Sequence, residues 1–132
     1  MPGQHIPPDH SRGDESTVGG YVAVHGRPVA LEGLDGMSYS LEILTDATGE
    51  PARPFGAYLL FVQWKRMGEQ GVSGHLETEF LGWGATAAMA HRMLAAMPLA
   101  QAQVELDAVV AAREGAGTRR WFDVMHDDGG LA

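Results

Sequence analysis

The chain has 132 residues, of which 45% are hydrophobic and 20% charged, which is the length and composition of one globular domain. It contains no cysteine, which excludes disulfides, thiolate nucleophiles and cysteine-ligated metal clusters. A formal net charge of −8 with only nine basic residues argues against nucleic-acid binding, because that affinity comes mostly from Lys and Arg on phosphates.

Residues 1–20 contain three prolines, four glycines and almost no large apolar side chain. Such a segment buries too little surface to offset its ordering entropy, so we expect a flexible N-terminal tail. The metal-binding residue types within it are His5, Asp9, His10, Asp14 and Glu15. Ligands on a flexible tail are not organised into a site, and we therefore predict no metal centre here.

The next segments predict strands. Residues 21–32 combine β-branched residues with Gly26-Arg27-Pro28, which indicates one bent edge strand or two short strands around a turn. Residues 37–44 alternate between apolar and polar positions, as a half-buried strand does. Residues 57–64 are apolar at nearly every position, and residues 75–81 form the last predicted strand.

Two helices are expected after the strands, at about 86–97 and 98–114. Thr86 is a suitable N-cap, Pro98 suits the first turn of the second helix, and both segments carry an apolar stripe at helical spacing. Residues 115–132 are expected to be a C-terminal tail, in which 119–126 form an edge strand or a docking segment.

This order of elements predicts a single α+β domain over residues 21–114. We expect an antiparallel β-meander of four to five strands, followed by two helices packed on one face of the sheet. Strand 57–64 is apolar on both sides, but two helices cover only one side. We expect the side that carries Leu59 and Phe61 to be covered instead by a second copy, a small ligand or the C-terminal segment.

Polar residues are expected to flank that uncovered side. The candidate ligand-binding residues are Ser40, Glu42, Phe61, His75, Glu77 and Glu79. An apolar floor between polar walls is typical both of a small-molecule pocket and of a protein interface. A metal site at His75 and Glu77 needs a further ligand, and an acid–base pair of Glu77 and Glu79 needs shared burial. We predict no catalytic residue, no metal site and no cofactor.

The stretch TRRWF, residues 118–122, sets two arginines beside two aromatic residues, a combination enriched in interface anchors. We hypothesise that Trp121 and Phe122 contact a partner subunit or close over the uncovered side of the sheet. The candidate interface residues are Leu59, Phe61, Arg119, Arg120, Trp121 and Phe122.

The sequence contains no serine-nucleophile, P-loop or dinucleotide motif. No apolar run approaches the roughly 20 residues that span a bilayer and no secretory signal is visible, so we expect a cytoplasmic protein. The leading interpretation is a small, acidic, non-catalytic protein of bacterial type that homodimerises through its sheet and binds a basic protein partner. The alternative is a small-molecule or metal-binding, weakly enzymatic module that uses the sheet face with Glu42, His75, Glu77 and Glu79.

Overall fold

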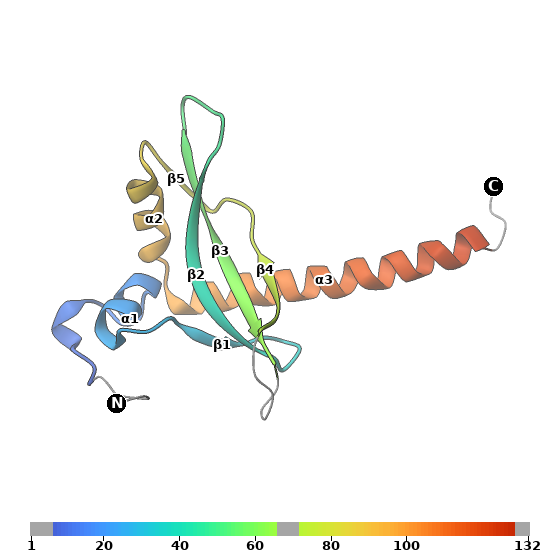
Figure 1. Cartoon of the computed structure of the whole chain (residues 1–132), viewed down its shortest axis with the longest axis horizontal. Coiled ribbons are helices and arrows are strands. Elements are labelled where there is room, and N and C mark those ends of the chain that lie inside the picture. Colours follow the sequence, from blue (N-terminus) through green and yellow to red (C-terminus); the bar gives the residue numbers. More distant parts are fainter. Residues whose placement is uncertain (1–6, 66–71, 129–132) are drawn as a thin grey trace.

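The computed structural model describes residues 7–65 and 72–128, except for the side chains of residues 72, 73 and 116–128. Figure 1 shows the arrangement of the elements in this part of the chain. In chain order they are η1 (His10–Arg12), α1 (Val18–His25), β1 (Ala30–Glu32), β2 (Ser38–Ala47), β3 (Phe55–Trp64), β4 (Val72–Glu77), β5 (Gly82–Gly84), α2 (Ala87–Ala95) and α3 (Leu99–Asp128). The predicted α+β class is confirmed.

The sheet is an antiparallel meander in the order β1-β2-β3-β4, as predicted, and β5 pairs with β3 as well. β4 lies beside residues 60–64 of β3, whereas β5 lies beside residues 55–57 at the other end of the same edge. The predicted strand over 75–81 is therefore extended only to Glu77, as the end of β4; residues 78–81 are irregular, and β5 follows at Gly82. β3 has neighbours along both edges, which makes it the central strand.

The register between strands decides which residues share a face of the sheet. Residues directly opposite each other in an antiparallel pair project to the same side. Leu41 is opposite Phe61, and Phe61 is opposite Leu76. On the other side, Glu42 is opposite Leu60, which in turn is opposite Glu77. We call the first side the core face and the second the open face.

The hydrophobic core lies against the core face. Leu59 and Phe61 have no exposed surface and belong to one cluster with residues from each of the three labelled α-helices. The helical members of this cluster are Val18 of α1, Ala90 and Leu94 of α2, and Ala102, Leu106 and Val110 of α3. Burying a leucine or phenylalanine contributes about 1.5–3 kcal/mol, so this cluster supplies a large part of the stability.

The N-terminal region differs from the prediction. Residues 21–25, expected in a strand, belong to α1, and only β1 keeps the extended form expected for 21–32. The Thr17 hydroxyl accepts a hydrogen bond from the Gly20 amide at 3.0 Å, and Gly26 ends the helix with φ 67°. These caps, with the burial of Val18 and Val24, outweigh the local strand propensity.

Residues 7–17, expected in a flexible tail, include η1, and the Asp9 amide donates a hydrogen bond to the Val24 carbonyl of α1.

The last helix also differs from the prediction. α3 continues to Asp128, whereas the sequence predicts an end near residue 114 and an edge strand over 119–126. The strand prediction is wrong, because the backbone of this segment is helical. Gly115 and Gly117 each disfavour a helix by about 1 kcal/mol relative to alanine, a cost that the flanking strong helix formers can offset. In Figure 1 the C-terminal half of α3 extends well beyond the sheet.

Candidate functional site

The open face carries a row of apolar side chains along β3. Tyr58, Leu60, Val62 and Trp64 alternate with the buried residues of the core face, and the first three are half-buried. Trp64 is 43% exposed, which places it among the large hydrophobic residues most accessible to solvent. An exposed apolar row on a central strand is uncommon unless it serves as a contact surface.

Two more aromatic residues lengthen this row toward β5. Phe80 lies edge-on to Tyr58, with ring centres 6.0 Å apart, and its ring occupies the space that a side chain at Gly56 would need. Trp83 is directly opposite Gly56 in the ladder, and the guanidinium carbon of Arg53 lies 4.3 Å from its ring centre. We call this row the β3 strip, made of Leu44, Tyr58, Leu60, Val62, Trp64, Phe80 and Trp83.

Polar residues line both long sides of the β3 strip. On β2, Ser40 and Glu42 lie opposite Val62 and Leu60, and on β4, His75 and Glu77 lie opposite the same two residues. The Trp64 indole donates a hydrogen bond to the Ser40 hydroxyl at 2.9 Å, which holds the ring against the β2 side. Glu42, His75 and Glu77 are exposed to solvent.

The sequence predicts six ligand-binding residues around one surface, and the register brings four of them together on the open face: Ser40, Glu42, His75 and Glu77. Glu79 follows the end of β4 and lines a cavity of about 330 Å³ with Tyr58, Thr78 and Phe80. In the sequence, Tyr58, Leu60, Val62 and Trp64 alternate along strand 57–64, but the prediction places the uncovered side at Leu59 and Phe61.

The structure corrects the prediction for Phe61 and Leu59. Both are candidate residues of an uncovered surface, yet both are 0% exposed and lie in the core. The reason is the β2–β3 register, which sets Leu41 opposite Phe61 and Ile43 opposite Leu59 and so places all four side chains on the core face. The uncovered apolar side is the other one, and its residues are Tyr58, Leu60, Val62 and Trp64.

The remaining interface candidates lie outside the described side chains. Arg119, Arg120, Trp121 and Phe122 are part of the helical backbone of α3, but the structure describes nothing of their side chains. Their predicted contact with a partner or with the sheet stays a prediction.

A polar network joins α3 to the β1–β2 turn. The Arg113 guanidinium donates to the Asp35 carboxylate at 2.8 Å and to Gln63 at 2.9 Å, and the Tyr39 hydroxyl donates to Asp35 at 2.6 Å. Burial raises the pKa of the Asp35 carboxyl, but hydrogen bonds from Tyr39, the Met37 amide and Arg113 outweigh it, so this pKa lies below its usual 3.8. Burial and the Asp35 carboxylate raise the pKa of the Tyr39 hydroxyl. These contacts fix the position of α3 against the β1–β2 turn.

The described side chains do not form a metal cluster. Among those of residues 7–65 and 74–115, no three His, Asp or Glu groups come together in a way that could hold a metal ion. In the same part of the chain, no helix has both the length and the apolar composition needed to span a bilayer. No family model matches the sequence, and no curated protein or solved structure is significantly similar to it.

Proposed function

We propose that the protein is a non-catalytic binding module that holds the basic surface of a protein partner on the β3 strip. The observation that supports this proposal is the combination of a partly exposed aromatic and aliphatic row with carboxylates along its sides. An apolar centre with a polar rim is the usual anatomy of a protein interface, and Tyr and Trp are enriched among its strongest anchors.

The charge of the open face favours a basic partner. Glu42, Asp46 and Glu77 project to this face from β2 and β4, and Glu79 lines the cavity beside Phe80. Arg53, which stacks on Trp83, places a positive charge at the β5 end of this face. Complementary charge increases the association rate and selects against acidic partners, in keeping with the net charge of −8.

Homodimerisation through the sheet is the second candidate, and the same exposed row supports it. Two strips packed face to face would remove Trp64 and Leu60 from water. They would also bring the Glu42 and Glu77 carboxylates of one copy close to those of the other, which opposes association at low salt. The two candidates therefore predict opposite effects of salt.

The small-molecule alternative has weaker support. The cavity beside Tyr58 and Phe80 is lined by only four residues. Pockets for drug-sized ligands enclose most of the ligand surface. His75 and Glu77 share the open face, but among the side chains that the structure describes no third metal-ligating residue joins them.

A direct test uses a helical probe peptide of about 17 residues, with leucine along one face and lysine on the other. Binding is measured by fluorescence anisotropy at about 50 and about 500 mM NaCl. We expect binding at low salt that weakens at high salt, and about tenfold weaker binding to Trp64→Ala. The matched control is Met93→Ala, an exposed hydrophobic residue on α2.

Two outcomes would contradict the proposal. Equal binding of a peptide with glutamate in place of lysine would remove the charge argument. Equal loss in Met93→Ala would show that the effect is not specific to the open face. Light scattering on the unliganded protein tests the second candidate, since a dimer that strengthens with salt and is lost in Leu60→Lys would favour self-association.

A further inference from the structure

The outer edge of β2 is only partly paired. β2 runs from Ser38 to Ala47, but β1 pairs with its residues 38–40 alone. The Leu41 amide still donates to the Val29 carbonyl, at 2.9 Å, so it points away from β3. Alternate amides along a strand point to the same side, and the amides of Ile43 and Thr45 therefore face outward too. Among the described residues, no strand pairs with this side of β2 beyond Leu41.

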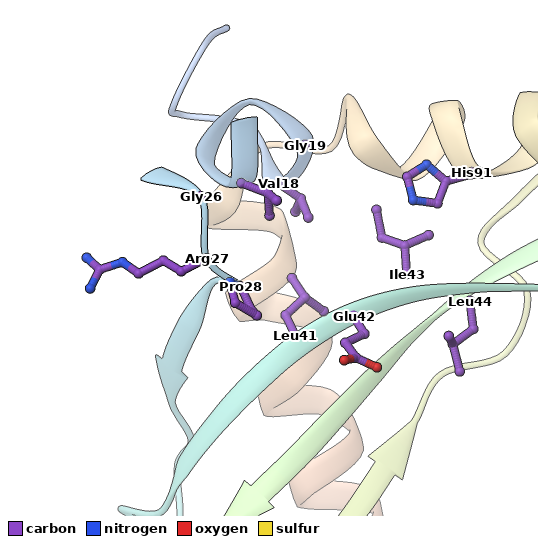
Figure 2. Close-up of a pocket in the computed structure, with 11 residues that line it drawn as sticks. Val18, Gly19, Gly26, Arg27, Pro28, Leu41, Glu42, Ile43, Leu44 and His91 are labelled. Carbon is purple, nitrogen blue, oxygen red and sulfur yellow. The ribbon is translucent and has the colours of Figure 1, made fainter. Parts of the chain in front are cut away.

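A cavity of about 450 Å³ lies beside this unpaired edge. Residues 26–28, which connect the end of α1 to β1, form part of its lining. Its wall is largely apolar, and Figure 2 shows Ile43 and the α2 residue His91 on the same side of β2. The residues that contribute most of the apolar wall are Val18, Val22, Pro28, Leu41, Ile43 and Leu44.

The edge lacks the backbone features that usually protect a free strand. Residues 41–47 contain no proline and no lysine and keep an uninterrupted register with β3, and their charged residues are Glu42 and Asp46. Exposed edges in natural proteins are normally interrupted by a bulge, a proline or a lysine, because unpaired amides recruit other strands. A regular edge beside an apolar cavity matches the geometry that binds extended peptides by strand addition.

We propose that this edge groove, formed by the outer edge of β2 and the cavity beside it, binds an extended peptide in which apolar and basic residues alternate. The backbone of such a peptide would pair with the outward amides and carbonyls of Ile43 and Thr45. Its alternate side chains fall on opposite sides of the sheet. One set enters the apolar cavity, and the other set lies beside Glu42 and Asp46, which are exposed on the open-face side.

Charge favours such a peptide over a second copy of the chain. In an antiparallel pairing of two β2 edges centred on Leu44, Glu42 of one copy stands opposite Asp46 of the other. Like charges directly opposite each other destabilise a strand pair. A peptide with lysine or arginine at these positions replaces that repulsion with attraction. The groove shares Leu44 with the β3 strip, but the rest of its lining comes from α1, from α2, from the segment that follows α1 and from the outer edge of β2, so the proposal does not rest on the strip.

The probe is a fluorescein-labelled peptide of about ten residues in which valine and lysine alternate, a length that matches one strand. Its first control has the same composition in a non-alternating order, and its second carries N-methyl groups on alternate backbone amides. We expect the alternating peptide to bind and both controls to bind at least about tenfold more weakly, because they lose the side-chain period or the backbone hydrogen bonds. These comparisons use the unaltered protein and do not depend on the folding of any variant.

Variants locate the site. Val22 lines the cavity from α1 and is 41% exposed, so Val22→Arg fills the entrance without disturbing the core. Val104→Arg is its matched control, at a valine of α3 that is 57% exposed. We expect about tenfold weaker binding only in Val22→Arg. Glu42→Lys should weaken the binding of the valine–lysine peptide and strengthen the binding of a valine–glutamate peptide.

Each alternative outcome overturns the proposal. Equal binding of the N-methylated peptide would exclude strand addition. Unchanged binding in Val22→Arg, or loss of binding in Leu60→Ala, which adds no charge beside Glu42, would place the peptide elsewhere. A dimer in the unliganded protein that Thr45→Pro dissociates, and that prevents peptide binding, would show that a second copy occupies the edge. If the valine–lysine peptide binds and the helical probe peptide does not, the edge groove is supported and the proposal for the β3 strip is contradicted.

Discussion

Arg113 and Asp35 are 78 positions apart in the chain, yet the guanidinium of one lies 2.8 Å from the carboxylate of the other. This contact holds α3 against the β1–β2 turn. Because the Arg113 side chain is 39% exposed, solvent weakens the ion pair. Its main effect is therefore to fix the position of α3, and it adds little to stability.

Replacing Arg113 should loosen the attachment of α3. We expect Arg113→Ala to lower the free energy of unfolding by about 1 kcal/mol, since it removes hydrogen bonds to Asp35, Tyr39 and Gln63 that solvent partly replaces. Urea unfolding followed by circular dichroism measures the change. Arg92→Ala, on the exposed side of α2, is the control and should change stability by less than about 0.5 kcal/mol.

Stability should fall in acid partly through Asp35. Its pKa in the folded state lies below the usual 3.8, so the carboxylate stabilises the fold above that value. This contribution is lost as the pH falls through the lowered folded-state pKa. Comparing wild type with Asp35→Asn at about pH 6 and about pH 3 isolates it, because the difference between the two proteins should shrink in acid. A difference that stays constant with pH would contradict the assignment.

Leu59 and Leu60 are adjacent residues of the same type on opposite faces of β3. Leu59 is 0% exposed in the core, whereas Leu60 is half-buried on the open face. We expect Leu59→Ala to cost about 3–5 kcal/mol of unfolding free energy and Leu60→Ala about 1 kcal/mol. Equilibrium denaturation of both variants tests the register, and a reversed order would show that the faces are assigned incorrectly.

Gly84 lies where β5 passes α2 at close range. A Cβ atom on Gly84 would come within 2.7 Å of the Ala90 amide nitrogen and 2.8 Å of the Met89 Cβ, which real contacts do not allow. Gly84→Ala should therefore lower the free energy of unfolding by about 1–3 kcal/mol, because the helix must move. Gly74→Ala in β4 is the control, where the nearest atom would be 3.8 Å away. Thermal melts of the two variants are the measurement.

Gly115 lies within α3, and a Cβ atom there would meet nothing within 4 Å. Gly115→Ala should strengthen the helix by about 0.5–1 kcal/mol, because alanine loses less backbone entropy than glycine. Increased ellipticity at 222 nm and a higher melting temperature would support the continuous helix. Unchanged values would indicate that the helix does not persist through this position.

The prediction of the fold was good wherever local pattern is decisive. Alternation identified β2, the apolar run identified β3, and Thr86 does cap α2, accepting a hydrogen bond from the Met89 amide at 3.1 Å. It failed at α1, whose residues have strand propensity and whose helical form depends on the caps at Thr17 and Gly26. It also failed in the last part of α3, where glycines suggested an end.

The candidate site, like the fold, was predictable from the sequence only in part. The sequence alone determined that β3 is apolar on both sides, that Ser40 and Glu42 share one side of β2, and that His75 and Glu77 share one side of β4. Only the tertiary structure decided which side of β3 they join, because a shift of one residue in the β2–β3 pairing exchanges the two faces completely. That pairing depends on the loop between the strands and on the packing of α2 and α3, which involve residues far apart in the chain. The same long-range packing holds residues 21–25 in α1. These residues therefore do not extend β1, and the outer edge of β2 stays unpaired beyond Leu41.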